Sequence, residues 1–431
     1  MIKKIITIFI IISFSGLNAK DNLIFFINSA LEKNPKINAE RKNLDSIKQN
    51  INISKSEFLP SVTISGSQTS TETKDITDQT GVKNSDSNRN TETKKISVDQ
   101  KIFQGFKGYN NLKKSQLEYE KANLEYKKVE QEIILKSVSS YYDLILKYKT
   151  KNFNLANVDL FERQVESDKA RLQKGEITLS DLAQSESSLA GANAKLIKSE
   201  TELIASIAEF ERVNRITPPE DLDANFKISI MTPKTLKDAL NKSFSNNPGL
   251  AIAKINLAIS EKELNVEKAN LSPSAVLNYS VTENNDLSST IDENEEETVK
   301  ATVTWPLIKG GKNLFNIKKF KFKKEQNQLL LEDKENEVKT QTSTAWSFFQ
   351  SSSSVLNSTS AQLKAAEIAN EGITLEYDSG SSRTTLELIQ SRALLLEARI
   401  SNAIAEKDLI VSKLELLKQV GGLNLKAIQA S

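Results

Sequence analysis

The feature that most constrains this chain is an internal duplication of its helix-breaking residues. Four pairs recur: Asn34-Pro35 with Asn247-Pro248 and Pro60 with Pro273 at a separation of 213 residues, and Gly105 with Gly310 and Gly175 with Gly380 at 205 residues. Proline and glycine end helices and set turns. A chain in which they recur in the same order is expected to fold into two copies of one structural unit.

The first 19 residues have the three-part pattern of a secretory signal peptide. Two lysines precede an apolar run from Ile5 to Phe14, and Ala19 supplies the small residue at which cleavage is expected. The run is too short to cross a membrane as a helix, and no later stretch reaches the roughly 18 apolar residues that such a helix needs. We therefore expect an exported protein, and an inner-membrane helical protein is excluded.

Composition argues against several classes of function. The chain has no cysteine and no histidine, so it lacks thiol chemistry, the commonest general base and the commonest transition-metal ligand. Loss of Lys3 and Lys4 with the leader reduces the basic residues from 58 to 56, which equals the 56 acidic residues. A neutral chain lacks the basic surface of a nucleic-acid binder. We expect no catalytic, cofactor or metal site, and no nucleic-acid partner.

Each copy shows the same order of predicted elements. A helix starts at the Asn-Pro pair, because Asn caps helices and Pro suits the first helical position, and it ends before the next proline. Alternating apolar and polar residues then predict a β-hairpin, at about 61–103 in the first copy and about 274–306 in the second. The polar stretch from Glu72 to Lys95 and the acidic segment "DENEEE" (292–297) are predicted to be loops at the hairpin tips.

Two long helices and two shorter ones complete the copies. Gly and Pro are absent from 109–174 and from 312–371, and apolar residues at heptad spacing predict a coiled-coil seam through Ile134, Val138, Tyr141, Ile145, Tyr148 and Leu155. The predicted helices are about 109–174, 178–213, 312–379 and 384–420. The first repeat is then 20–213, the linker 214–235, the second repeat 236–421 and the tail 422–431. The two shorter helices of each repeat, placed end to end, match the long helix in length.

Two hairpins supply only four strands, whereas the smallest membrane β-barrels need about eight. Strands that alternate apolar with polar residues suit a sheet with lipid on one face and water on the other. Because open sheet edges are not tolerated in lipid, closure would require several chains. The alternative is a coiled-coil protein with two exposed surface hairpins.

The ordered set of motifs resembles the TolC family of outer-membrane efflux proteins. It comprises the duplicated Asn-Pro starts, "FLP" and "LSP" before the hairpins, "IFQGF" and "PLIKGG" before the long helices, and "RLQKGEITLSDLAQSESSL" and "EYDSGSSRTTLELIQSRALLLEA" at the far turns. The resemblance implies a mainly α fold with a β-barrel part. Three copies would form a twelve-stranded outer-membrane β-barrel that is continued by a periplasmic α-helical barrel.

The same resemblance implies a passive exit duct of a tripartite efflux or type I secretion system in the outer membrane of a Gram-negative bacterium. Its partners would be two further copies of the chain, a periplasmic adaptor protein, an inner-membrane transporter and the outer-membrane lipid. The rival interpretations are an exported structural coiled-coil envelope protein without a pore and, with less support, an exported enzyme. Whether the duct exports drugs or proteins is not written in the sequence.

The resemblance also implies which residues close the periplasmic end. By motif, they are Ser180 and Asp181 in the first repeat and Tyr377, Arg383, Glu387 and Gln390 in the second. Glu387 would form an acidic constriction ring, and Gln390 stands at a second, normally acidic position. The turns that would meet the adaptor are Lys174, Gly175 and Glu176, and Ser379, Gly380 and Ser381.

Overall fold

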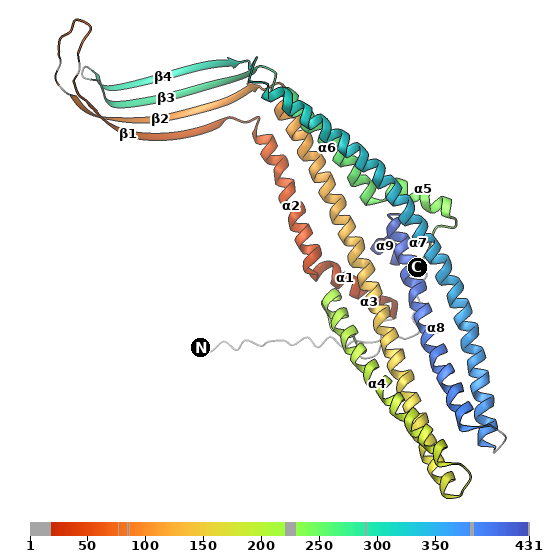
Figure 1. The fold of residues 1–431 in the computed structure, drawn as a ribbon. Helices are drawn as coiled ribbons and strands as arrows, with labels where there is room; N and C mark the ends of the chain where they lie inside the picture. The colour runs from red at the N-terminus through yellow and green to blue at the C-terminus, as the bar shows by residue number, and fades with distance from the viewer. Residues whose placement is uncertain are drawn as a thin grey trace, which may run out of the picture. The chain divides into compact units, whose positions relative to one another are not determined.

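The structure is a computed structural model that describes residues 19–75, 77–83, 85, 87–219, 230–288, 291–379 and 383–429 (Figure 1). The predicted signal peptide lies outside these residues, except for Ala19. The elements are α1 (Ala19–Lys33), α2 (Pro35–Ser56), β1 (Ser61–Thr73), β2 (Ser87–Phe103), α3 (Lys107–Gln173), α4 (Leu179–Asn214), α5 (Leu236–Asn246), α6 (Pro248–Ala269), β3 (Ser274–Ser288), β4 (Ile291–Thr304), α7 (Lys312–Asp378), α8 (Thr385–Gln419) and α9 (Leu425–Gln429).

The chain divides into two compact units. The helical unit comprises residues 1–41, 125–250 and 335–431, and the sheet unit comprises residues 42–124 and 251–334. Each unit contains residues from both halves of the chain. Four helices, α2, α3, α6 and α7, have residues in both units. No helix in the described part of the chain is long and apolar enough to cross a membrane.

The core of the helical unit gathers apolar side chains from α1, α3, α4 and α8. Phe26 of α1 packs edge-on against Phe210 of α4, with ring centres 5.1 Å apart, and also lies against Tyr141 of α3. Leu414 of α8 is fully buried in the same cluster. The contact between α1 and α4 explains why α1, which the sequence did not predict, is helical: its apolar face is covered by the coiled-coil helices.

The duplicated asparagines join helix ends within the helical unit. Asn34 accepts the Lys36 N–H at 3.0 Å, as an N-cap does, and its amide donates to the Val213 carbonyl in the last turn of α4 at 3.0 Å. Asn247 does the same in the second repeat: it accepts the Gly249 N–H at 2.9 Å and donates to the Gln419 carbonyl of α8 at 2.9 Å. Each asparagine side chain therefore pairs with a backbone N–H at the start of one helix and with a backbone carbonyl at the end of another, groups that have no partner within their own helices. This is the end-to-end contact that the matched helix lengths predicted.

The sheet unit holds one antiparallel sheet in the order β1-β2-β3-β4 (Figure 1). The two hairpins lie side by side, since β2 pairs with β3 in addition to its hairpin partner β1. β1 and β4 are the edges, and nearly all their residues are exposed. Both edges therefore present a row of unpaired backbone groups to their surroundings.

The register makes the sheet amphipathic. One row across all four strands is Val62, Val98, Tyr279 and Val299, and the adjacent row on the other face is Ser61, Asp99, Asn278 and Lys300. On the polar face the Asn278 amide donates to the Asp99 carboxylate at 2.8 Å. On the opposite face, Val299 and Val303 are each 72% exposed. Apolar residues cover that face from 275 to 281 in β3, a distance of roughly 20 Å along the strand.

The hairpin tips differ from the prediction. Strand residues occupy part of the predicted loop 72–95, because β1 extends to Thr73 and β2 begins at Ser87. The "DENEEE" segment lies wholly in β4. Pairing with the neighbouring strands holds these polar residues in the sheet. The loop prediction was therefore wrong for 72–73 and 87–95 and for "DENEEE".

The coiled-coil seam also drifts. Leu155 is 44% exposed, and the buried positions at this level are Asn154, Val158 and Phe161. The buried seam at this level therefore lies one residue earlier than the heptad pattern predicts, and the prediction for Leu155 was wrong.

Candidate functional site

The two far turns of the helical unit begin their second helices in the same way. α4 starts after Thr178 and α8 starts after Thr384, and each threonine caps its helix. The third helical residue, Asp181 or Glu387, closes a capping box by reaching back to the threonine backbone. The two carboxylates that the sequence singled out thus occupy equivalent positions and satisfy orphan N–H groups.

The hydrogen bonds of the two boxes match closely. The Thr178 N–H donates to Asp181 at 2.9 Å, and the Thr384 N–H donates to Glu387 at 2.8 Å. The Thr178 hydroxyl lowers the pKa of Asp181, while the Thr384 backbone N–H and hydroxyl lower that of Glu387 below its ordinary value of 4.5. Folding lowers the pKa values of both carboxyl groups. The two caps therefore stabilise the folded chain fully at a pH above the ordinary pKa values, and this stabilisation is lost as the pH falls through the lowered pKa values.

Arg383 stands between two carboxylates of the same chain. Its Nε donates to Glu376 Oε2 at 2.5 Å and one terminal nitrogen donates to Glu387 Oε1 at 3.2 Å. Glu376, followed by Glu387, raises the pKa of the guanidinium. The structure therefore brings Arg383 and Glu387 together, and this pairing was not among the sequence predictions.

A buried polar cluster joins the four helices near the turns. The carboxylate of Asp168 in α3 is fully buried. It accepts hydrogen bonds from Ser185 of α4 at 2.5 Å, from Gln164 at 2.9 Å and from Tyr377 of α7 at 3.1 Å. The Tyr377 hydroxyl is also 3.2 Å from the Thr385 hydroxyl at the start of α8. We call these five side chains the Asp168 cluster; it ties the end of one repeat to the end of the other.

Two arginines flank the Asp168 cluster without contacting its carboxylate directly. The Arg171 guanidinium lies 4.8 Å from the centre of the Tyr377 ring, a cation–π distance. Arg392 donates to the Gln164 side-chain oxygen at 3.3 Å. Burial raises the pKa of Tyr377 and lowers that of Arg392. The tyrosine hydroxyl therefore stays protonated and donates its hydrogen bond over the physiological range.

The other predicted site residues do not join the Asp168 cluster. Most are exposed: Ser180, Gln390, Lys174, Gly175, Glu176 and Ser379. Glu176 pairs with Arg171 at 3.4 Å. Gly175 has φ +76°, and an added Cβ there would meet open space. Gly380 and Ser381 lie outside the described residues. Gln390 lines an open groove of about 460 Å³ between α7 and α8, together with Arg383 and Glu387.

Sequence reasoning missed Asp168, Gln164, Ser185 and Thr385. One signal was available: Asp168 lies three residues after Val165 and seven after Phe161, which is a core position of the shifted seam. A carboxylate at a core heptad position needs buried partners. Which partners it finds depends on packing between helices more than 200 residues apart, as the Asp168–Tyr377 bond shows.

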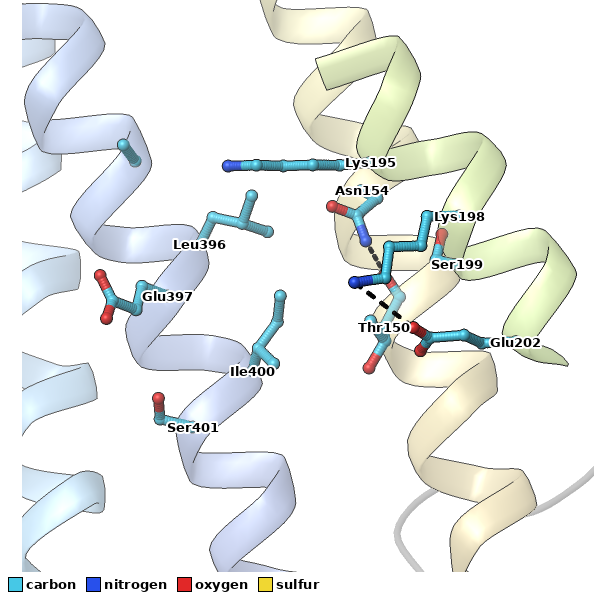
Figure 2. A pocket seen from close by; sticks show the side chains of 11 residues that line it. Thr150, Asn154, Lys195, Lys198, Ser199, Glu202, Leu396, Glu397, Ile400 and Ser401 are labelled. Carbon is cyan, nitrogen blue, oxygen red and sulfur yellow. Dashed lines mark hydrogen bonds and ion pairs between the residues drawn. The ribbon is translucent and has the colours of Figure 1, made fainter. Parts of the chain in front are cut away.

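A second cavity of about 380 Å³ lies between α3, α4 and α8 (Figure 2). Lys198 pairs with Glu202 of the same helix at 3.9 Å, and Asn154 donates to the Thr150 carbonyl at 3.0 Å. Lys195 extends across the gap toward Leu396 (Figure 2). Glu202 also accepts from Lys147 of α3 at 2.9 Å, so its carboxylate is held by lysines of two helices. The cavity has no features of an active site.

The chain is similar in sequence to outer membrane efflux proteins. A model of the outer membrane efflux protein family matches residues 26–211 and 239–422, one segment in each repeat. The chain is 23% identical over 393 residues to the outer membrane efflux protein BepC of Brucella suis, covering 91% of this chain and 83% of the relative. It is 20% identical over 435 residues to the outer membrane protein TolC of Vibrio cholerae, covering 98% and 96%.

Solved structures show the same fold. The CmeC outer membrane channel of Campylobacter jejuni superposes with a TM-score of 0.79 at 14% identity, covering 94% of this chain and 86% of that one. The open state of the MtrE outer membrane channel of Neisseria gonorrhoeae gives 0.76 at 15% identity, covering 95% and 93%.

The family match extends over both repeats, from α1 to the end of α8. It leaves the rival interpretation of a pore-free coiled-coil envelope protein without support, and it assigns no enzymatic activity. The sheet that is apolar on one face and the long helices agree with an outer-membrane exit duct that has a large periplasmic helical part. The chain belongs to the outer membrane efflux protein family.

Proposed function

We propose that three copies of the chain close one channel, with the four-stranded sheet in the outer membrane and the helices in the periplasm. The observation that carries this proposal is the amphipathic sheet with two unpaired edges, β1 and β4. Lipid does not tolerate such edges, and four strands are fewer than the roughly eight of the smallest barrels. Three copies supply twelve strands, with β4 of each copy pairing with β1 of the next.

The two faces of the sheet support this arrangement. The apolar face is exposed, as the lipid-facing surface of an outer-membrane barrel is. The polar face carries charged and amide groups, including Asp99 and Lys300, which suit a wet lumen. We also propose that each copy of the chain consists of two structural repeats, 20–213 and 236–421. The linker 214–235 joins them, and the tail 422–431 follows the second.

The trimer is tested by the mass of the particle extracted from outer membranes in mild detergent, after correction for bound detergent. Three chains per particle are expected, and the particle should conduct ions in a planar bilayer. A particle of one or two chains that is recovered without detergent would overturn the proposal.

The duct would work with a periplasmic adaptor and an inner-membrane transporter that delivers the cargo. The turns at Lys174–Glu176 and at Ser379–Ser381 are our proposed adaptor contacts. Support comes from their position at the ends of the helical hairpins and from the exposure of the described residues among them. Drug efflux and type I protein secretion both remain compatible with this duct.

We further propose that the periplasmic end is closed by the Asp168 cluster and by the Arg383 bridge between Glu376 and Glu387. Both join α7 to α8, and the cluster also joins them to α3 and α4. In a trimer, Glu387 would appear three times around the axis, and a ring of carboxylates attracts cations.

Replacing Glu387 by glutamine is expected to lower the cation selectivity of the reconstituted channel several-fold. Glutamine can still close the capping box with Thr384, so this variant removes the charge while the helix start is kept. The measurement is the reversal potential in a salt gradient across a planar bilayer.

Asp159→Asn is the control, because Asp159 is an exposed carboxylate of α3 that is not among the predicted closing residues. Its selectivity should stay close to that of the wild type. An unchanged reversal potential in Glu387→Gln, or an equal change in both variants, would contradict the assignment of the ring to Glu387.

A further inference from the structure

The start of α7, directly after the last strand, is strongly basic. The segment 309–324, "KGGKNLFNIKKFKFKK", contains seven lysines and no acidic residue. Phe315 and Phe322 are interleaved with the lysines and are exposed. A basic helix start with exposed aromatic residues is typical of a segment at a membrane surface.

The duplication supplies a second instance of the same pattern. At the separation of 205 residues that relates Gly105 to Gly310, three lysines recur: Lys107 with Lys312, Lys113 with Lys318, and Lys114 with Lys319. Both long helices therefore begin with lysines at equivalent positions after their hairpins. An incidental run of lysines in one helix would not be repeated in the other.

The lysines of the segment 309–324 divide into two groups by their partners. Those farther along the helix are paired with carboxylates: Lys321 with Glu325 at 3.9 Å, Lys323 with Glu263 at 2.6 Å and Lys324 with Glu261 at 3.6 Å. Lys309, Lys312, Lys318 and Lys319, which lie nearer to the strand, have no ion pair within the described part of the chain. We call these four residues the α7 lysine group. Lys318 and Lys319 lie over the Phe322 and Phe320 rings at 5.9 Å and 5.8 Å, contacts in which no carboxylate compensates their positive charge.

Apolar side chains surround the α7 lysine group and continue from the sheet. Ile308, 89% exposed, and Leu307 connect β4 to α7, and Leu314 and Phe315 in the first helical turn are also exposed. Trp305 is exposed, and its indole N–H donates to the Leu271 carbonyl at 3.1 Å. Large apolar side chains followed by lysines over one to two helical turns match the change from hydrocarbon to headgroups.

We propose that the α7 lysine group binds the headgroups of anionic phospholipids in the periplasmic leaflet of the outer membrane. The inference rests on the proposed placement of the sheet in that membrane. Lys318 and Lys319 lie six and seven residues after Lys312, which is about 10 Å along the helix. Anionic headgroups attract basic residues over a Debye length of about 8–10 Å. The paired lysines of the next turn lie beyond this range.

A second copy of the chain is a poorer occupant of this surface. A neighbouring copy would bring its β1 edge and the α2 helix that precedes it. The part of α2 in the sheet unit, 42–56, carries Lys42, Lys48 and Lys55 against the single acidic residue Asp45. A basic surface does not complement the α7 lysine group, whereas phosphate diesters do.

The test uses the purified full-length channel in detergent, titrated with short-chain phosphatidylglycerol or phosphatidylcholine and followed by native mass spectrometry. The wild type should prefer phosphatidylglycerol, and the preference should weaken as salt is raised. The triple variant Lys312→Gln/Lys318→Gln/Lys319→Gln should lose on the order of a hundredfold in affinity for phosphatidylglycerol, since each lysine contributes about fivefold, or about 1 kcal/mol.

The matched control is Lys195→Gln/Lys339→Gln/Lys364→Gln, three exposed lysines of the helical unit, which should bind phosphatidylglycerol like the wild type. Equal binding of the two lipids by the wild type, or unchanged binding by the α7 triple variant, would overturn the proposal. If the α7 triple variant lost chains from the particle while each chain still bound phosphatidylglycerol, the partner of the α7 lysine group would be a second copy of the chain and not a lipid. The mass of the wild-type particle reports separately on the trimer.

Discussion

Replacing Gly421 by alanine is expected to destabilise the helical unit by about 3 kcal/mol. Gly421 has φ +69°, and a Cβ there would lie 2.2 Å from the backbone oxygen of Asn246, which cannot move aside as a flexible side chain could. The left-handed conformation costs an L-residue about 1–2 kcal/mol, and forced overlap adds about 1–3 kcal/mol. The change in the free energy of unfolding is measured by urea titration of the helical circular dichroism signal.

The position of Gly421 explains why the effect should be large. It follows the C-cap of α8, and the Gly422 N–H donates to the Leu417 carbonyl at 2.8 Å, as in a Schellman motif. Asn246 ends α5, and the next residue, Asn247, holds the end of α8 through Gln419. Strain at Gly421 therefore acts where α5, α6 and α8 meet.

Gly191→Ala and Gly372→Ala are matched controls within helices. An added Cβ at either position would meet open space. Both variants should equal the wild type in stability or exceed it by about 0.5–1 kcal/mol, because alanine favours helix more than glycine does. If Gly421→Ala behaved like these controls, the close contact with Asn246 would be wrong.

Replacing Asp168 by alanine is expected to loosen the turn end of the helical unit by about 3 kcal/mol and to raise the resting conductance of the channel. The substitution leaves the buried donors of Ser185, Gln164 and Tyr377 without their acceptor. Each unsatisfied buried group costs about 1–3 kcal/mol, and partial access of water reduces the sum. Faster amide exchange is expected at the adjoining ends of α3, α4, α7 and α8.

Asp159→Ala, an exposed carboxylate on the same helix, is the control and should change neither quantity. Asp168→Asn keeps the shape and one acceptor, so it should have an intermediate effect. If Asp168→Ala showed faster amide hydrogen exchange but no rise in resting conductance, the Asp168 cluster would stabilise the helix ends without closing the channel.

The duplication made the order of elements readable from the sequence. Pro60 and Pro273 mark the ends of α2 and α6 because proline excludes the preceding residue from the helix, a local rule that packing rarely overrides. The Asn-Pro pairs predicted helix starts for the same reason. Their second role, the bond from Asn34 to the Val213 carbonyl, involves residues far apart in the chain, and no local rule predicts it.

Where prediction failed, contacts distant in sequence decided the outcome. The polar residues from 87 to 95 are strand because β2 has partners on both sides. Arg383 and Glu387 were chosen by motif, and their bond to each other is a local one between residues four apart. Asp168 was missed because its acceptor role depends on Tyr377, which lies 209 residues away.

The most direct test of the central claim is disulfide crosslinking between the two sheet edges of different copies. The natural chain has no cysteine, so Thr63→Cys in β1 can be combined in turn with a cysteine at Thr298, Lys300 or Thr302 in β4. All four positions lie on the polar face, and Thr63 is level with Thr298 across the sheet. Each single-cysteine variant can link at most two chains and serves as the control.

If β4 of each copy pairs with β1 of the next around a closed barrel, oxidation in intact outer membranes should give a ladder of one, two and three chains for at least one pair. The ladder should end at three. A ladder that continued beyond three chains, or one that never exceeded a single chain for all three pairs, would contradict the account of the protein as a trimeric outer-membrane duct.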